Sequence, residues 1–275
     1  MPELPEVETI ARGLDRRVAG DSIESLWIGS RKQPLKSPAG IIAAALEGKR
    51  IVRVHRAGKH IVFDLEGAAI QKKSAPESVQ WIVHLGMTGR LVVCGPSEEI
   101  VKHTHMIAKL ASGRELRFID PRMFGKLSVH FGSFDPGGIE PLEVGEKQFV
   151  ALFRGRKTPI KSALLNQKLL RGVGNIYADE SLFRAGIRPR RRAATITREQ
   201  LARLRRAVQE VLREAIRLGG SSISDYVDAD GKEGFFQLRH RVYGREGEPC
   251  LVCGSPIRRV VLSGRSSHYC PKCQK

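Results

Sequence analysis

Residues 50–65 read RIVRVHRAGKHIVFDL. Two runs rich in β-branched residues, 50–55 and 61–65, flank the turn signal Ala57-Gly58, which is typical of a β-hairpin. Further short β-rich runs, separated by similar turn signals, extend from residue 22 to about residue 131. They are residues 23–28, 79–85, 91–94, 105–110, 116–119 and 126–130. This pattern predicts an antiparallel sandwich or barrel.

Helical spacing appears on both sides of these runs. Apolar residues recur at helical intervals over residues 7–18, which predicts a first helix. The sequence Asp135-Pro136-Gly137-Gly138, followed by Pro141, marks a boundary. Beyond it we expect helices over residues 146–153, 162–166, 176–185 and 197–218. The chain is therefore expected to belong to the α+β class, with a β-rich part before a basic helical part.

The charge of the chain is large and unevenly distributed. Its 275 residues include 47 Lys and Arg against 29 Asp and Glu, a formal net charge of +18. Residues 154–217 hold 17 of the basic residues but only 5 of the acidic ones. A solvated helix face usually alternates the sign of its charges, so this segment favours a surface that faces phosphates. A lipid surface is not favoured, because residues 199–218 contain no Trp or Phe that could anchor in it.

Four of the five cysteines form two CxxC pairs, Cys250 with Cys253 and Cys270 with Cys273. Each pair makes a tight turn that can aim two thiolates at one ion, and sixteen residues separate the pairs. This spacing predicts a zinc ribbon with one structural Zn²⁺ and no open coordination position for catalysis. Two disulfides are the alternative, but nothing in the sequence suggests export.

The segment between the two cysteine pairs is expected to form a hairpin. Residues 257–262 and 267–269 would be its strands, and its tip would present Arg265. His268 lies near the ligands and could replace one of them, although Cys270 has the better spacing. The fifth cysteine, Cys94, falls in an apolar strand and is expected to be a buried hydrophobe.

The start of the chain brings together Pro2, Glu3 and Glu6. After a small residue such as Pro2 the initiator Met is normally removed, which would leave a secondary amine. An α-amine has a pKa near roughly 8, so part of it is neutral at physiological pH and can attack a sugar C1′. On spacing alone a simpler interpretation is favoured, in which Pro2 starts a helix and both carboxylates complement its dipole.

Several motifs change that balance. They are PELPEVET (2–9), HLGMTGR (84–90), DPRMFG (120–125), GVGNIYADESLF (172–183), DGKEGFF (230–236) and GRSSHYCPKCQK (264–275). In this order they resemble the bacterial formamidopyrimidine-DNA glycosylase (Fpg/MutM) family, which repairs oxidised purines. The resemblance implies an N-terminal helix plus antiparallel β-sandwich, then a helix-two-turn-helix domain with a zinc-ribbon hairpin. The expected divisions are residues 1–134, a linker at 135–145, 146–238 and 239–275.

The resemblance also implies catalytic roles. Pro2 would form a Schiff base with C1′, and Glu3 would protonate the opened sugar oxygen. Lys59 would be the acid of β-elimination and Arg265 that of δ-elimination. A phosphate clamp formed by the basic hairpin is an equal alternative for Lys59. Because an Arg stays protonated, Arg265 is more safely assigned to holding the lesion phosphate.

A base inside a duplex must be flipped out before an amine can reach its sugar, and the gap must be filled. The resemblance nominates Met87, Arg122 and Phe124. Met and Phe are apolar wedges, and Arg122 can bind the Watson–Crick edge of the orphaned cytosine. Both wedges would more often be core residues, but their glycine-containing loops favour exposure.

Contacts to DNA are implied for a further set of residues. Asn175 would grip a phosphate at a helix N-terminus, with a simple N-cap as the compatible alternative. Glu6 would bind near the flipped nucleotide or cap its helix. The other implied DNA contacts are His103, Arg156 and Lys161. Residues 221–236, with glycines as hinges, resemble the loop that closes over the extruded base.

Taken together, the sequence predicts a base-excision repair enzyme with glycosylase and lyase activity. Its partner would be damaged double-stranded DNA, with Zn²⁺ as the one cofactor and a monomer as the expected state. No apolar run approaches the roughly 20 residues of a membrane span, and we expect a cytoplasmic, nucleoid-associated protein of a bacterium. The alternatives are an endonuclease VIII-like glycosylase for oxidised pyrimidines and a non-catalytic DNA-binding zinc protein.

Overall fold

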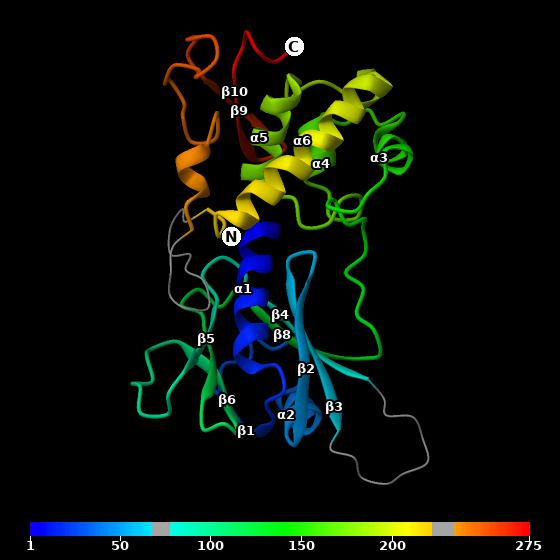
Figure 1. The fold of residues 1–275 in the computed structure, drawn as a ribbon. Coiled ribbons are helices and arrows are strands. Elements are labelled where there is room, and N and C mark those ends of the chain that lie inside the picture. The colour runs from blue at the N-terminus through cyan, green and yellow to red at the C-terminus, as the bar shows by residue number, and fades with distance from the viewer. Residues whose placement is uncertain (68–77, 222–233) are drawn as a thin grey trace. The chain divides into compact units, whose positions relative to one another are not determined.

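The computed structural model describes residues 1–67, 78–221 and 234–275 (Figure 1). The chain divides into two compact units. We call the unit that contains Glu6–Asp135 the β-unit, and the unit that contains Pro136–Ser221 and Phe235–Lys275 the helical unit. Met1–Pro2 groups with the β-unit, whereas Glu3–Pro5 groups with the helical unit. The loop expected at residues 221–236 falls almost entirely outside the described residues.

The β-unit contains two antiparallel four-stranded sheets. One has the order β1-β6-β7-β5, formed by Ile23–Ile28, Thr104–Leu110, Glu115–Ile119 and Arg90–Cys94. The other has the order β2-β3-β4-β8, formed by Lys49–Ala57, His60–Gly67, Val79–His84 and Lys126–Phe131. All eight expected strands are present, and their ends differ from expectation by at most two residues. Two separate sheets make this a sandwich and exclude the barrel.

One hydrophobic core joins both sheets to the first helix, α1 (Leu4–Val18). The helix buries Val7, Ile10 and Leu14 at helical spacing, as the sequence predicted. From the strands, Phe63 and Trp81 stack with their ring centroids 4.4 Å apart. The apolar side of α1 therefore packs on the sandwich (Figure 1). This packing fixes the position of the helix within the β-unit.

A short helix, α2 (Ala39–Leu46), was not expected from the sequence. Its sequence AGIIAAAL contains no polar residue, so it has no alternation of polar and apolar faces to reveal a helix. Pro38 precedes it and provides no side-chain cap. Burial of Ile42 and Leu46 in the core stabilises the helix instead.

The helical unit contains α3 (Glu146–Phe153), α4 (Ile160–Leu164), α5 (Asn175–Ala185) and α6 (Arg198–Arg217). Two short 3₁₀ helices, η1 (Ala193–Thr195) and η2 (Phe236–Arg239), complete its helical elements. A capping box between Thr197 and Gln200 starts α6, and Gly186, with φ of 68°, ends α5. The expected helix at 162–166 lies two residues earlier, directly after Pro159, because proline suits the position that precedes a first turn.

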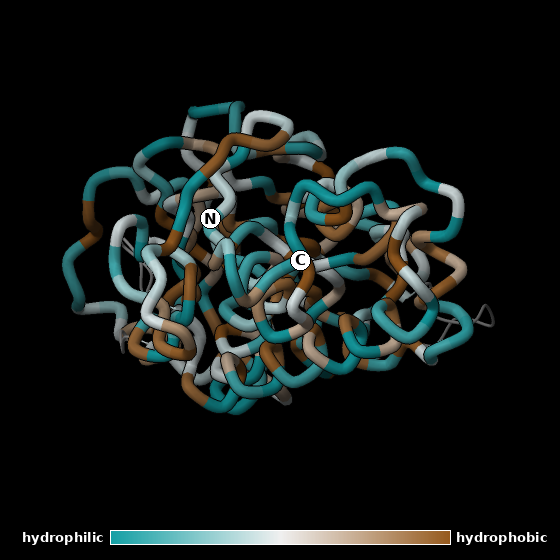
Figure 2. The backbone as a smooth tube through the Cα atoms, turned by 90° about the horizontal axis from the view of Figure 1, so that it is seen from above, coloured by the Kyte–Doolittle hydropathy of each residue, from teal (hydrophilic) through white to brown (hydrophobic). Residues whose placement is uncertain are grey.

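The C-terminal hairpin pairs β9 (Arg258–Leu262) with β10 (Arg265–Tyr269). Arg265 is the first residue of β10 and pairs with Leu262, so the turn itself is Ser263-Gly264. Among the described residues, no helix is long and apolar enough to cross a membrane. Hydrophilic and hydrophobic segments alternate along the whole traced chain (Figure 2).

Candidate active site and nucleic-acid interface

The four cysteines of the two CxxC pairs converge on one point. Their Sγ atoms all lie within 4.8 Å of one another. Cys250 Sγ is 3.9 Å from Cys273 Sγ, and Cys253 Sγ is 3.4 Å from Cys270 Sγ. Tetrahedral zinc with Zn–S bonds of about 2.3 Å requires Sγ separations near roughly 3.8 Å, so the cluster fits one Zn²⁺.

His268 and Cys94, the other two residues considered together with the zinc ligands, lie outside the four-sulfur cluster. His268 does not belong to the four-sulfur cluster, because its backbone N–H donates to Asp179 Oδ2 at 2.9 Å. Cys94 was expected to be buried but is only half-buried. The alternation along β5 explains this, since Leu91 and Val93 point to the core and Cys94 to the other face.

The carboxylate of Glu3 lies at the N-terminus of α5. The backbone N–H of Ile176 donates to Glu3 Oε1 at 3.3 Å, and Leu4 N–H donates to the carbonyl of Gly172 at 3.0 Å. Glu3 is 5% exposed, and Pro2 before it is half-buried. A Cβ on Gly174 would lie 2.1 Å from the carboxylate carbon of Glu3. Glycine is therefore required here for the carboxylate to reach the helix start, where the dipole favours its negative charge.

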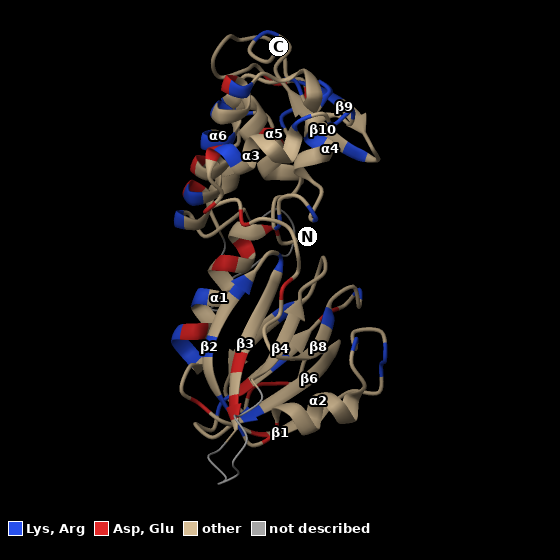
Figure 3. Ribbon diagram, turned by 90° about the vertical axis from the view of Figure 1, so that its right-hand side faces the viewer, with Lys and Arg blue, Asp and Glu red and all other residues tan. Residues whose placement is uncertain are grey.

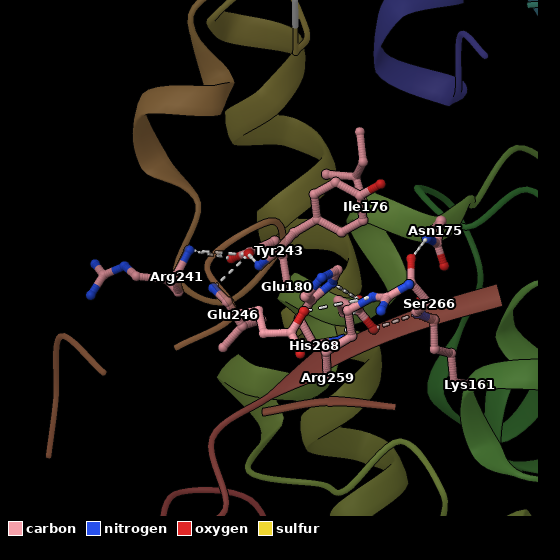
Figure 4. Close-up of polar contacts among 12 residues, drawn as sticks. Lys161, Asn175, Ile176, Glu180, Arg241, Tyr243, Glu246, Arg259, Ser266 and His268 are labelled. Carbon is pink, nitrogen blue, oxygen red and sulfur yellow. Dashed lines mark hydrogen bonds and ion pairs between the residues drawn. The ribbon is translucent and has the colours of Figure 1, made fainter. Parts of the chain in front are cut away.

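Lys161 lies inside the helical unit and not on its surface (Figure 4). Its Nζ is 2.7 Å from Asp179 Oδ1 and donates to the carbonyl of Ser266 at 2.6 Å. The side chain is 1% exposed, and burial lowers the pKa of its ammonium while Asp179 opposes that shift. This position differs from the solvent-facing one expected of a phosphate contact. Lys161 instead links α4 and α5 to β10, the strand that begins with Arg265.

Asn175 is the first residue of α5, and Gly174 is its N-cap. The side chain of Asn175 is thus not the cap, and its Nδ2 donates to Ser266 Oγ at 3.4 Å (Figure 4). It also hydrogen-bonds the hydroxyl of Tyr243, whose pKa is raised mainly by burial. Tyr243 was not singled out from the sequence, because nothing in the neighbouring residues marks it.

Glu180 fixes the segment that carries Tyr243. Its carboxylate is fully buried and accepts hydrogen bonds from the backbone N–H groups of Arg241, Val242 and Tyr243. Burial raises the pKa of Glu180, and these donors act in the opposite direction. Without the carboxylate, buried N–H groups would lose their acceptor, so Glu180 holds Tyr243 against α5.

In the β-unit, Lys59 lies in the two-residue turn between β2 and β3. It is 9% exposed and stands beside His84, whose pKa falls to about 4 through burial and then through its neighbours His60 and Lys59. Arg56 donates to Glu8 at 2.8 Å and is mostly buried, so it is not available as a phosphate clamp. The roles weighed for Lys59, catalytic acid or phosphate contact, stay predictions.

The three side chains nominated for the gap in the duplex lie on exposed loops of the β-unit. Met87 and Phe124 are 47% and 49% exposed, which is unusual for large apolar residues. The guanidinium of Arg122 lies 4.8 Å from the ring centroid of Phe124. The expectation that these residues are not core is confirmed by their exposure, and their role on DNA stays a prediction.

The other candidates are spread over both units. His103 is exposed in a turn before β6, with a φ of 69°, and Arg156 is exposed after α3. Glu6, in contrast, is 2% exposed within the first turn of α1. In the helical unit, Lys and Arg mark several places along α6 and β9 (Figure 3). The segment with the excess of basic residues, 154–217, includes α6 and Lys161, whereas Arg265 lies outside it on β10.

A β-sandwich, a helical unit with a Cys₄ zinc site, and an N-terminal carboxylate on a helix start define the class of two-domain, zinc-finger DNA glycosylases. Family models match the formamidopyrimidine-DNA glycosylase N-terminal domain at residues 1–127, its H2TH domain at 138–227, and the zinc finger found in FPG and IleRS at 247–275. The chain belongs to the formamidopyrimidine-DNA glycosylase family.

Individual relatives agree over the full length. The formamidopyrimidine-DNA glycosylase of Solibacter usitatus is 47% identical, with 100% of both chains covered. The crystal structure of the Thermus thermophilus MutM (FPG) protein superposes with a TM-score of 0.85 at 42% identity, covering 99% of this chain and 98% of that one. A Lactococcus lactis FPG mutant in complex with Fapy-dG-containing DNA has a TM-score of 0.88 at 32% identity, with both chains covered completely.

Proposed function

We infer that this protein is a base-excision repair enzyme that removes 8-oxoguanine and formamidopyrimidines from duplex DNA and then cleaves the abasic site. The observation that carries this function is the carboxylate of Glu3, one residue after Pro2, held at the start of α5 by a glycine that leaves just enough room. A non-catalytic DNA-binding zinc protein could use Glu3 to stabilise α5, but it would not need a proline directly before that carboxylate. The full-length similarity to glycosylases, including relatives solved with damaged DNA, supports the same conclusion.

In the proposed reaction, Pro2 becomes the terminal residue once Met1 is removed. Its neutral nitrogen attacks C1′, the bond from C1′ to the damaged base breaks, and the base leaves with the proton that the nitrogen loses. The bond from C1′ to the sugar ring oxygen then breaks as Glu3 donates a proton to that oxygen, which leaves an iminium ion between Pro2 and C1′. Loss of a C2′ proton then allows the C3′–O bond to break, and a second elimination breaks the C5′–O bond. Water finally hydrolyses the imine and frees Pro2.

The resemblance to the glycosylase family also suggests roles for the other residues. We propose Lys59 as the acid at β-elimination, while Arg265 holds the lesion phosphate and serves the δ-elimination step. Asn175, His103 and Arg156 would bind the DNA backbone. The other proposed contributors to DNA binding are Met87, Arg122 and Phe124 in the gap, Glu6 near the flipped nucleotide, and Lys161 acting through β10. The Zn²⁺ would hold the hairpin and take no part in the chemistry.

The units act on one duplex in this proposal. Residues 1–134 would carry Pro2, Glu3 and Lys59, residues 135–145 would be a linker, residues 146–238 would bind the DNA backbone, and residues 239–275 would form the zinc finger that carries Arg265. The matched family segments support these divisions. Because the substrate is chromosomal, we further propose that the protein works in the cytoplasm in association with the nucleoid.

Borohydride trapping tests the function directly. Sodium borohydride should reduce the iminium ion and give a covalent complex of the protein with an 8-oxoguanine:cytosine duplex. The N-terminal mass must first show that Met1 is absent, because an uncleaved Met acylates the nitrogen of Pro2. Failure of the processed protein to form an adduct, or equal trapping by Pro2→Gly at matched occupancy, would overturn the nucleophile assignment.

A second duplex separates the two glycosylase classes. Excision of 8-oxoguanine should exceed excision of thymine glycol from an otherwise identical duplex. The opposite order would favour an endonuclease VIII-like enzyme for oxidised pyrimidines.

A further inference from the structure

The loop of Met87 and the loop of Arg122 and Phe124 touch each other through their backbones. Gly86 has φ of 65°, and a Cβ on it would lie 2.5 Å from the nitrogen of Gly125 and from the carbonyl carbon of Phe124. No side chain fits between the two loops at this point. A displacement of one loop must therefore be transmitted to the other.

A single buried carboxylate connects the two loops. Asp120 is 0% exposed, and its Oδ1 accepts hydrogen bonds from Thr88 Oγ1 at 2.5 Å and from the backbone N–H of Arg122 at 3.2 Å. Its Oδ2 accepts from the N–H of Gly125 at 2.7 Å. Donors from both loops therefore converge on this one side chain. Hydrogen bonds to a charged acceptor are stronger than neutral ones.

The backbone of Asp120 is itself fixed. Its N–H donates to the carbonyl of His103 at 3.0 Å, and its carbonyl lies 2.9 Å from Nε2 of His105. His105 is 5% exposed, and because a carbonyl can only accept, Nε2 must carry a proton. The backbone of Asp120 is thus held by β6 and by the turn before it.

We propose that Asp120 is a positioning residue that locks the loops of Met87, Arg122 and Phe124 into one rigid element and thereby sets the discrimination of the base opposite the lesion. This inference rests on the proposed function, because it concerns how the excision site examines its substrate. Asp120 touches no reacting atom, and it acts through the N–H of Arg122 and the hydroxyl of Thr88.

The physical reason is pre-organisation. Arg122 can distinguish an orphaned cytosine from adenine only if its guanidinium is held at a defined place, since hydrogen-bond discrimination depends on geometry. The exposed Arg122 side chain has a stacking contact with Phe124, and Asp120 binds the backbone on both sides of that pair. Loss of the carboxylate would remove the hydrogen bonds that fix the loop of Arg122 relative to the loop of Met87. Both side chains would still be present, but their relative position would no longer be fixed.

Three variants test this proposal. Thr88→Val removes the hydroxyl with little change in shape, Thr88→Ser restores it, and Asp120→Asn replaces an acceptor oxygen with a donor. Ser112→Ala is the matched control, because Ser112 Oγ also donates to a carboxylate, Oδ2 of Asp21 at 2.5 Å, but in a hairpin turn away from these loops. Single-turnover excision of 8-oxoguanine is measured opposite cytosine and opposite adenine, together with the thermal midpoint of each protein.

The preference for cytosine over adenine should fall about tenfold in Thr88→Val, the equivalent of one lost hydrogen bond to a charged group, and further in Asp120→Asn. Thr88→Ser and Ser112→Ala should keep the wild-type ratio. An unchanged ratio in Thr88→Val would overturn the proposal even if Asp120→Asn failed to fold. A wild-type protein that neither excises 8-oxoguanine nor forms the trapped adduct would refute the proposed function instead.

Discussion

Replacement of Gly174 by alanine should displace the Glu3 carboxylate without disturbing the fold. Gly174 has φ of −128° and ψ of −163°, an extended conformation that any residue adopts, so alanine brings no backbone strain. The added Cβ would lie 2.1 Å from Cδ of Glu3 and 2.3 Å from its Oε1. Ordinary contact begins near 3.4 Å, so the carboxylate must move by more than about 1 Å. The atoms in the way are the end of a flexible side chain, which can give way.

A misplacement of about 1 Å in a catalytic group can lower the rate about 100-fold, and we expect a loss of this order in single-turnover excision of 8-oxoguanine. The thermal midpoint should change only modestly, because the side chain can move aside. Gly145→Ala provides the matched control. Gly145 is also the N-cap of a helix, α3, with φ of −73°, and a Cβ there has no neighbour within 4 Å.

The excision rates of the two variants are compared after mass spectrometry has shown that Met1 is removed from both. Gly174→Ala should lose excision while Gly145→Ala retains it. If Gly174→Ala excises at the wild-type rate, the carboxylate of Glu3 does not have to stand at the start of α5, and the reasoning fails.

Four further predictions follow from the structure. Cys250→Ala should lose the bound zinc and lower the thermal midpoint, and stoichiometric zinc in metal analysis of this variant would refute the Cys₄ site. Lys161→Met removes the ammonium that pairs with the buried Asp179 carboxylate and should cost about 3–5 kcal/mol in urea unfolding, whereas exposed Arg156→Met should cost less than about 1 kcal/mol. Burial lowers the pKa of His84 and of His240 from 6.5 to about 4 in the folded state. The stability that these neutral histidines contribute is therefore present above pH 6.5 and is lost as the pH falls towards 4. The loss should be at most about 1.4 kcal/mol per pH unit for each histidine, and His84→Gln should reduce that slope. Affinity for duplex DNA should fall steeply between low and physiological salt, and a logarithmic plot of affinity against salt with no slope would contradict a phosphate-binding surface on the helical unit.

The eight strands and the main helices could be predicted from the sequence because their signals are local. Short β-rich runs between turn residues mark the strands, and apolar residues at helical spacing mark the helices. The short α2 could not be predicted, because its sequence is apolar on all sides. The sequence also could not distinguish a sandwich from a barrel. That choice depends on strand pairing, and here the strands pair within two separate sheets instead of one closed sheet.

The site was predictable in part. Exposure of Met87 and Phe124 followed from their glycine-containing loops, and the zinc ligands followed from spacing alone. The roles of Asp120, Asp179 and Tyr243 did not follow, because each acts on partners distant in the chain. A polar residue in a sequence motif shows that a hydrogen bond will be made, but not to which atom.

By itself, the sequence determined the chemical groups that this protein can offer: a proline at position 2 followed by a carboxylate, four thiolates at zinc spacing, and a cluster of basic residues. The tertiary structure alone decided which charges remain available. It buries Lys161 against Asp179 and pairs Arg56 with Glu8, while Arg265 and Arg122 stay exposed. The physical reason is that the cost of desolvation depends on where a residue lies in the fold, so an Arg is a buried ion-pair partner at one position and an exposed side chain at another.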